Sequence, residues 1–270
     1  MMPDDNARPF LKWPGGKRSI MSDLLPRVPG TYKAYYEPFT GGGALYFRLQ
    51  PDDATISDVN CNLMTTYTQV RDDVDAVIRI LAEHEPNHNP EYYYKVRSGF
   101  PVKDNPAKIA GDMIYLNRTC FNGMYRENRK GKFNVPVGKY VNPAILDESN
   151  LRAASRALAS VRIVLRDFSC TEITEGGFYY LDPPYHGTYS QYSSGGFNDD
   201  KHIELADFCH RLDKAGAFFM LSNSDTTLIR KLYDDYNIEQ VAALRSVSRK
   251  AEQRKRENEL LIRNYGCIRR

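Results

Sequence analysis

The feature that most constrains this chain is an alternation of short apolar runs with helical patterns, which holds near both ends and fails in the middle. Because parallel strands need crossover helices, this alternation predicts an α/β sheet with helices on both faces and ligands at the carboxyl ends of the strands. The predicted strands begin at Tyr35, Thr55, Arg162, Phe178, Ala217, Ile238 and Glu259. The predicted helices span 19–25, 62–83, 91–99, 107–116, 147–159, 199–215 and 226–236.

One of these apolar runs stops on Asp182, which is followed by Pro183, Pro184 and Tyr185. Each proline fixes its φ angle, lacks an N–H and keeps the preceding residue out of the helical region. The result is a stiff carboxylate, exposed backbone carbonyls and an aromatic ring, which together suit a planar substrate that carries an amino group. A plain strand-to-loop turn with a buried tyrosine explains the tetrapeptide about equally well when it is taken alone.

A run of three glycines, Gly41 to Gly43, follows the first aromatic strand and precedes a helical pattern. Such glycines let a ligand approach the backbone, and the helix N-terminus behind them favours polar ligand groups. Further on, Asp58 ends the second predicted strand, where an acid can accept hydrogen bonds from ribose hydroxyls. Together these features predict an adenosine-bearing ligand, although Asp58 and Asn60 also suit the start of the next helix.

The alternation stops at Pro86, and we predict an inserted subdomain over 61–146 between the α/β segments 1–60 and 147–270. Asn-Gly and Lys-Gly pairs predict a β-hairpin over 117–140. The hairpin holds one acid, Glu127, and interleaves aromatic and amide residues with basic ones, as phosphate contacts and base reading require. A solvated basic hairpin is the alternative. Its basic residues are Arg118, Arg126, Arg129, Lys130, Lys132 and Lys139.

The composition of 41% hydrophobic and 26% charged residues is that of an ordinary globular protein. The net charge is only +3, so any nucleic-acid surface must be local. Five scattered cysteines without C-x-x-C spacing predict reduced thiols in a cytoplasmic protein, and neither a zinc site nor a disulfide framework. No apolar run approaches the roughly 18 residues of a membrane span.

Two loops beyond the tetrapeptide also suggest function. We expect the Gly/Ser/Tyr-rich loop at 186–196 to be mobile enough to close over a substrate. The polar run at 248–258 is either a solvated loop or a second contact with nucleic acid. The basic residues in and beside it are Arg245, Arg249, Lys250, Arg254, Lys255 and Arg256.

The ordered motifs resemble those of the Dam-type adenine-N6 DNA methyltransferases, the alpha group of the D12 class. In that family a glycine motif comes first, a target-recognition insert second and D-P-P-Y last, and the similarity covers nearly the whole chain. One motif alone is weak, whereas the ordered set is highly specific. The motifs are L-K-W-P-G-G-K, E-P-F-T-G-G-G, S-D-V-N, N-R-x-x-F-N-G-x-x-R, F-N-V-P-V-G-K-Y, L-D-P-P-Y and L-S-N-S-D.

The resemblance implies a doubly wound, mixed seven-stranded sheet with S-adenosylmethionine as methyl donor and no metal. It also implies that 1–60 and 147–270 form the catalytic domain and that 61–146 recognises the target. The partner would be double-stranded DNA, commonly at GATC, bound by a monomer or a weak dimer. The protein would be cytoplasmic and nucleoid-associated, encoded by a bacterium or phage, and its role in restriction-modification or strand marking stays open.

By matching motif positions, the resemblance also assigns roles to individual residues. The catalytic residues would be Asp182, Pro183, Pro184 and Tyr185. The cofactor site would contain Trp13, Lys17, Glu37, Phe39, Gly41, Asp58, Phe168 and Asp182, with Asp58 at the ribose and Phe168 at the adenine. DNA would be contacted by Lys12, Arg118, Asn122, Met124, Arg126, Asn128, Pro136 and Tyr140.

The chemistry that follows concerns an amine that is a poor nucleophile and is buried in duplex DNA, so the adenine must be flipped out. Tyr185 would stack on the base, while the Asp182 carboxylate and the Pro183 carbonyl accept its N–H groups and stabilise the developing positive charge. Two alternatives stay open. One is a methyltransferase that acts on RNA or on a protein amide, and the other is a catalytically idle, sequence-specific DNA-binding module.

Overall fold

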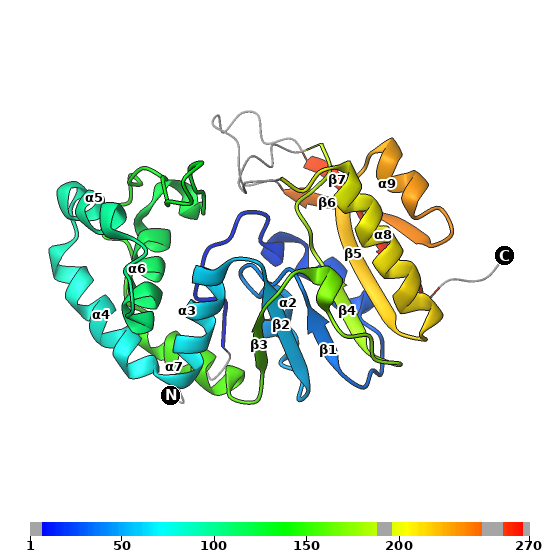
Figure 1. Cartoon of the computed structure of the whole chain (residues 1–270), viewed down its shortest axis with the longest axis horizontal. Coiled ribbons are helices and arrows are strands. Elements are labelled where there is room, and N and C mark those ends of the chain that lie inside the picture. Colours follow the sequence, from blue (N-terminus) through cyan, green and yellow to red (C-terminus); the bar gives the residue numbers. More distant parts are fainter. Residues whose placement is uncertain (1–6, 188–195, 245–255, 267–270) are drawn as a thin grey trace. The chain divides into compact units, whose positions relative to one another are not determined.

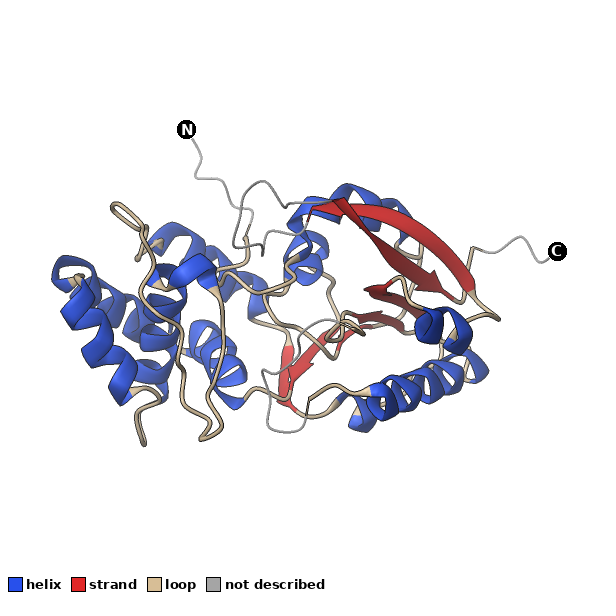
Figure 2. Ribbon diagram, turned by 90° about the horizontal axis from the view of Figure 1, so that it is seen from above, coloured by secondary structure: helices blue, strands red, loops and turns tan. Residues whose placement is uncertain are grey.

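The computed structural model describes residues 7–187, 196–244 and 256–266. Within them, the strands are β1 (Tyr35–Glu37), β2 (Ala54–Asp58), β3 (Arg162–Leu165), β4 (Phe178–Leu181), β5 (Phe218–Ser224), β6 (Asn237–Leu244) and β7 (Arg256–Arg263). They form one sheet in the order β3-β2-β1-β4-β5-β7-β6 (Figures 1 and 2). The pairs β1–β2, β1–β4 and β4–β5 are parallel, whereas β7 is antiparallel to β5 and β6. The expected mixed seven-stranded α/β sheet is confirmed.

Most of the longer helices begin at an Asn, Asp or Thr whose side chain accepts a backbone N–H of the first turn, as N-cap chemistry predicts. The α-helices are α1 (Met21–Leu24), α2 (Ala44–Leu49), α3 (Cys61–Asp72), α4 (Val74–Asn87), α5 (Pro90–Gly99), α6 (Pro106–Thr119), α7 (Glu148–Leu158), α8 (Asp199–Lys214) and α9 (Thr227–Leu232). Single 3-10 turns are η1 (Lys17–Ile20), η2 (Leu25–Arg27), η3 (Phe121–Gly123) and η4 (Phe168–Cys170).

The prediction of a single helix over 62–83 was wrong, because Asp73 separates α3 from α4. Asp73 has a non-helical backbone with φ of −146°, and its carboxylate accepts the backbone N–H of Ala76 at 3.1 Å. The apolar positions keep their helical spacing across this break, so periodicity alone does not reveal it. The N-cap chemistry of Asp73 is the signal that marks the break.

The chain divides into two compact units, which are described separately. The first comprises Met1–Gly16, Gly41–Gln50 and Asn60–Leu165, and the second comprises Lys17–Thr40, Pro51–Val59 and Arg166–Arg270. In the first unit, α6 packs against α3, α4 and α5 (Figure 1). The buried His84 of α4 bonds to Asp112 of α6 at 2.9 Å and stacks on Tyr115 of the same helix, so this histidine has a structural role.

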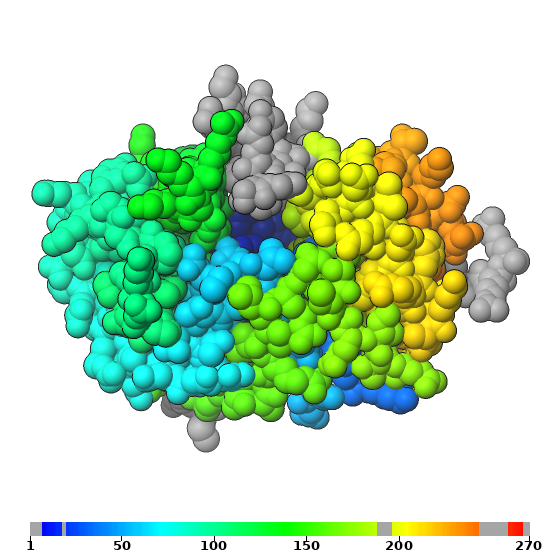
Figure 3. Space-filling model, in the orientation of Figure 1, coloured from blue at the N-terminus to red at the C-terminus, as the bar shows by residue number. Residues whose placement is uncertain are grey.

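In the second unit, α8 lies along the sheet beside β4 and β5, and its outer side forms part of the surface coloured yellow in Figure 3. The buried side of α8, including Leu205 and Phe208, joins a core that also contains Tyr179 of β4 and Phe219 of β5. Tyr179 stacks in parallel on Tyr36 of β1, with ring centroids 4.5 Å apart. This packing holds β4 rigidly, and therefore also its carboxyl end.

The segment 117–140 runs antiparallel but does not form a continuous ladder. Within it, the β-bridges join Cys120 to Val137 and Glu127 to Phe133. Helix α6 extends to Thr119, and Asn122 and Gly123 take left-handed backbone conformations, which interrupts regular pairing on that side. The segment 117–140 therefore consists of two antiparallel loop strands that are joined by isolated β-bridges, and we call it the bridged loops.

Other expectations fall partly outside the described residues. These include 188–195 of the predicted closing loop, and Arg245, Arg249, Lys250, Arg254 and Lys255 of the second basic cluster. No helix in the described part of the chain is long and apolar enough to cross a membrane.

Candidate active site and nucleic-acid surface

The carboxylate of Asp182 stands directly after β4, the strand between β1 and β5. Pro183 behind it is buried and Pro184 is exposed, so the chain leaves the sheet in the rigid turn that the sequence predicted. The side chain of Asp182 is 20% exposed. Its Oδ1 forms an ion pair with the Nζ of Lys17 at 2.7 Å. Lys17 begins η1, and its side chain is 5% exposed.

The electrostatic setting of Asp182 is that of a desolvated carboxylate with a cation beside it. Burial raises the pKa of Asp182 to about 6, and the nearby charge of Lys17 opposes this rise. The negative charge of Glu259 raises the pKa further. At neutral pH the group is therefore mostly ionised and able to accept hydrogen bonds.

Tyr185 is held at three points. Its hydroxyl donates to Oε2 of Glu259 at 2.7 Å, and the Nζ of Lys17 lies 4.9 Å from the centre of its ring. The backbone of the next residue, His186, donates its N–H to Oδ1 of Asn223 at 3.0 Å and accepts the Ser224 hydroxyl at 2.5 Å. The end of β5 thus fixes the position at which the tetrapeptide leaves the site.

The ends of β1 and β2 carry the two acids predicted to bind a cofactor. Glu37 is buried and accepts the Tyr35 hydroxyl at 2.8 Å, while Asp58 is half-buried at the end of β2. The hydroxyl of Thr40 lies within hydrogen-bonding distance of the carbonyls of Glu37 and Ser57, at 2.8 and 2.9 Å. It therefore ties the two strand ends together.

An aromatic pair lies in the same unit. Phe39, just beyond β1, stacks on the buried ring of Phe168 with centroids 5.4 Å apart. Phe197 contacts both rings from the start of the α8 segment. Phe168 is therefore the buried base of the cluster, and the half-buried rings of Phe39 and Phe197 give it an apolar surface of the kind that suits a planar heterocycle.

In the first unit, the ring of Trp13 lies against the glycine turn. A Cβ added to Gly41 would come within 2.5 Å of Trp13 Cδ1, and the residue has a positive φ of 47°, so both space and conformation require glycine. The Tyr67 hydroxyl donates to the Gly41 carbonyl at 3.1 Å. The ring of Tyr125 also stacks on that of Trp13, with centroids 5.2 Å apart.

Lys12 is held in place by the buried amide of Asn117. The amide accepts the Lys12 N–H and donates to the Lys12 carbonyl, both at 2.7 Å, and also donates to the Gly123 carbonyl at 3.1 Å. A Cβ on Gly123 would lie 2.5 Å from the Lys12 side chain. Thus fixed, the Lys12 ammonium lies 4.3 Å from the centre of the Tyr140 ring.

The other predicted DNA-binding residues differ in how firmly they are held. Arg126 donates through Nε to Oδ1 of Asn134 at 2.6 Å, and Arg118 donates to the Phe10 carbonyl at 3.1 Å. The Asn128 side chain accepts the N–H groups of Lys130 and Lys132, so it shapes the turn. The exposed residues of the set are Asn122, Asn128, Pro136 and Tyr140, and Met124 is half-buried.

The structure therefore brings together Asp182, Lys17 and Tyr185, and separately Phe39 with Phe168, within the second unit. Within the first unit it brings together Lys12 with Tyr140 and Trp13 with Gly41. Sequence reasoning missed three supporting residues: Glu259, Asn117 and Tyr125. Asn117 opens the N-R-x-x-F-N-G motif and could have been singled out there, whereas no local pattern marks Glu259.

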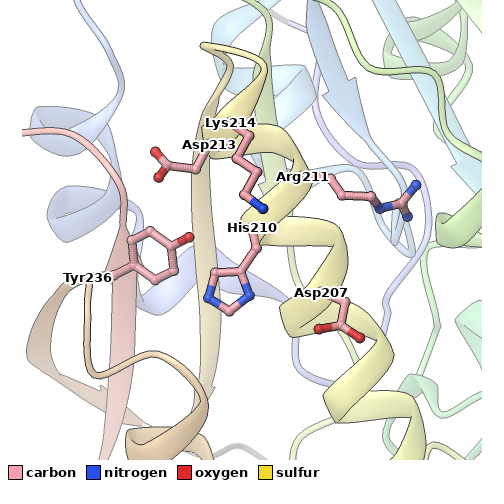
Figure 4. Close-up of a pocket in the computed structure, with 6 residues that line it drawn as sticks. All are labelled: Asp207, His210, Arg211, Asp213, Lys214 and Tyr236. Carbon is pink, nitrogen blue, oxygen red and sulfur yellow. The ribbon is translucent and has the colours of Figure 1, made fainter.

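A surface pocket of about 460 Å³ lies elsewhere on the second unit, between α8 and the segment that enters β6 (Figure 4). Acidic and basic side chains alternate around it, as they do on a solvated helix face. One of these acids, Asp213, accepts a hydrogen bond from the side-chain amide of Asn264 at 2.8 Å. The pocket contains none of the predicted site residues, and its lining is Asp207, His210, Arg211, Asp213, Lys214 and Tyr236.

Metal ligation is not indicated by the described side chains. Among residues 7–187, 196–244 and 256–266, no group of three or more His, Cys, Asp or Glu side chains is arranged to hold a metal ion. Of the four described cysteines, all free thiols, Cys120 and Cys209 are buried. Burial raises the pKa of Cys120 to about 12, which makes it a poor nucleophile.

The mixed seven-stranded α/β sheet has the form of a methyltransferase fold, and comparison with known proteins shows that the chain is a methyltransferase. The model of the D12 class N6 adenine-specific DNA methyltransferases matches residues 13–247, and the chain belongs to this family.

Several named relatives align with this chain over almost its full length. The Type II methyltransferase M.MjaIII of Methanocaldococcus jannaschii is 42% identical, over 96% of this chain and 99% of its own. The Type II methyltransferase M1.LlaDCHI of Lactococcus lactis subsp. cremoris is 38% identical, over 97% of this chain and 96% of its own. The DNA adenine methylase of Escherichia coli K12 is 29% identical, over 94% of each chain.

Replacing Asn117 tests the clamp on Lys12. Because Asn117→Ala removes three hydrogen bonds to the backbone of Lys12 and Gly123 at a buried amide, we expect the free energy of unfolding in urea to fall by at least about 2 kcal/mol. The control Asn122→Gly removes an exposed amide from the same motif and keeps the left-handed turn, so it should change stability by less than about 0.5 kcal/mol. Equal stability of Asn117→Ala and the wild type would contradict the clamp.

Proposed function

We propose that the protein transfers a methyl group from S-adenosylmethionine to the N6 amine of an adenine that is flipped out of a short duplex DNA site, expected to be GATC. The observation that carries this proposal is the rigid Asp182 carboxylate at the end of β4, beside Lys17 and Tyr185. The family membership defines the substrate class as adenine in DNA. The cofactor, the flipping step and the sequence are the parts proposed here.

Asp182 and the Pro183 carbonyl act as the two acceptors for the N–H groups of the adenine amine. Because both are fixed by the strand end and the prolines, they hold the amine with its lone pair aimed at the methyl group. Their negative charge and dipole stabilise the positive charge that develops on the nitrogen in the transition state. The acceleration comes from orientation and electrostatics, without a strong base.

Tyr185 stacks on the flipped base. Its ring stands next to Asp182 in the chain and is held through its hydroxyl by Glu259. A base outside the duplex loses its stacking partners, and an aromatic ring in the protein replaces part of that energy.

The side chains of the second unit fit S-adenosylmethionine, which supplies an electrophilic methyl group when it is bound. Asp58 would provide acceptors at a strand end for ribose hydroxyls, and the adenine would lie against the half-buried ring of Phe39 and the buried ring of Phe168 on which Phe39 stacks. Glu37 supplies a negative charge suited to an ammonium group. By the resemblance, Lys17, Asp182, Trp13 and Gly41 complete the set.

DNA recognition falls to the bridged loops at 117–140 and to Lys12. Arg126 suits base reading because Asn134 orients its guanidinium, and an oriented fork can bind a guanine edge. Exposed Arg129, Lys130 and Lys132 suit phosphate contacts. Names such as DNA adenine methylase and Type II methyltransferase among the relatives favour a role in site-specific DNA marking or restriction-modification.

The direct test of the function is methyl transfer from labelled S-adenosylmethionine to duplexes that contain GATC or a permuted sequence. We expect N6-methyladenine, detected by nucleoside mass spectrometry, in GATC duplexes only. Digestion with methylation-sensitive nucleases of different specificity identifies the site. Label in RNA or protein but not in DNA would overturn the proposal.

Removing the acceptor should abolish catalysis without abolishing binding. We expect Asp182→Ala to lower kcat by at least about 10³-fold, because charge stabilisation at the reacting nitrogen is lost. Its dissociation constant for duplex DNA, measured by fluorescence anisotropy, should stay within about threefold, since the base-reading residues lie elsewhere in the chain. Near-wild-type turnover in this variant would rule out the assigned role.

The pH dependence of kcat/KM should report the ionisation of Asp182. The carboxylate must be ionised to accept, so activity should fall as pH drops through about 6, the pKa of Asp182. Lys17 lowers that pKa, so Lys17→Met should move the acid limb to higher pH, whereas Lys17→Arg, which keeps the charge, should leave it closer to that of the wild type. If the acid limb lies at the same pH in all three proteins, the influence of the Lys17 charge on Asp182 is contradicted.

Removing the oriented guanidinium should relax sequence choice at one base pair. We expect Arg126→Ala to lower discrimination there by about 1–3 kcal/mol, measured as kcat/KM on duplexes with single substitutions. The comparison variant Arg129→Ala should weaken binding evenly on all sequences. An even loss in Arg126→Ala as well would make Arg126 a phosphate contact.

A further inference from the structure

A buried carboxylate that the proposed reaction does not use lies beside the tetrapeptide. Glu259 stands on β7 opposite Ser224 of β5, and the residue is only 8% exposed. Its Oε2 accepts the Tyr185 hydroxyl at 2.7 Å. Taking a charged group out of water is costly unless it is paired, so a buried glutamate whose described partner is a tyrosine hydroxyl calls for an explanation.

We propose that Glu259 is a positioning residue that holds the ring of Tyr185 in the orientation needed to stack on the target adenine. The inference rests on the proposed function, in which Tyr185 receives the flipped base. Under this inference, β7 helps to position the residues that follow β4, through the hydrogen bond between Glu259 and Tyr185.

The ring of Tyr185 is held at both ends. At its backbone end, two prolines precede it, and the following residue, His186, is bound through its N–H by Asn223 and through its carbonyl by Ser224. At its hydroxyl end, Glu259 accepts the only proton that the side chain can donate. A hydrogen bond to a charged acceptor is short and directional, so it restricts rotation of the ring about its side-chain bonds. The stacking face is thereby organised before the base arrives.

The charge of Glu259 has a second effect that can be measured separately. It raises the pKa of Asp182, together with burial and against Lys17. The groups around this pair are Lys17 from η1, Tyr180 from β4, Tyr185 itself and Glu37 from β1, which acts on Tyr180. Replacing Glu259 by glutamine removes the charge but keeps an oxygen that can accept the Tyr185 hydroxyl.

Three variants of the full-length protein test the inference through kcat, the KM for a duplex substrate and the pH profile. We expect Glu259→Ala to lower kcat about ten- to a hundredfold with a smaller change in KM, because the ring loses its tether while the DNA contacts remain. Tyr185→Phe, which keeps the ring and loses the hydroxyl, should show the same loss. The double variant should lose no more than either single variant, since both remove one interaction.

The conservative variant separates positioning from a merely structural role. Glu259→Gln should keep kcat within about threefold of the wild type at pH 8, and its acid limb should move to lower pH because a negative charge near Asp182 is gone. The control Asp234→Asn makes the same change of charge at an exposed turn of the same unit and should move neither quantity. Urea unfolding and calorimetric binding of S-adenosylmethionine check that each variant is folded.

The outcomes are distinct. A wild-type protein that does not methylate adenine in DNA overturns the proposed function. An active wild type with unchanged Glu259→Ala, or with independent losses in the double variant, overturns only the role of Glu259. If Glu259→Ala does not fold, the other two variants test the inference. An unchanged kcat in Tyr185→Phe overturns it, and so does an acid limb of Glu259→Gln that stays at the wild-type pH.

Discussion

The arrangement at the end of β4 depends on keeping a carboxylate charged where most of its hydration is removed. Asp182 can remain ionised there because Lys17 lies 2.7 Å away, and Lys17 itself is almost fully buried. Each charge lowers the cost of burying the other, since an isolated buried charge tends to be neutralised. The strand that carries Asp182 is packed between β1 and β5, so the cost of holding the pair is supported by the core of the sheet.

The same pair sets the properties of its neighbours. Lys17 is shared between Asp182 and the face of Tyr185, and Tyr185 is in turn bonded to a second carboxylate, Glu259. Burial, opposed by Lys17 and aided by Glu259, raises the pKa of Asp182 to about 6, close enough to neutrality that small changes in nearby charge alter its ionisation. Catalysis by orientation suits this setting, because fixed acceptors need no reorganisation during the reaction.

The first unit follows the same physical rule with neutral groups. Asn117 satisfies three backbone groups with one buried amide, and Asn134 holds the guanidinium of Arg126. Side chains for DNA recognition are long and flexible, so ordering them before binding lowers the entropy lost in the complex. In both units, supporting residues fix the geometry of the side chains that we propose for the chemistry and for base reading.

The sequence alone determined the α/β class, the positions of most strands and helices, and the rigid acidic turn at 182–185, because periodicity, capping and proline chemistry act over a few residues. It missed the break at Asp73, where the regular apolar spacing hid a capping signal. Only the tertiary structure paired Glu259 with Tyr185, 74 residues apart, and Asn117 with Lys12, 105 apart. Those contacts arise from the insertion of β7 between β5 and β6 and from helix packing, and no local pattern encodes them.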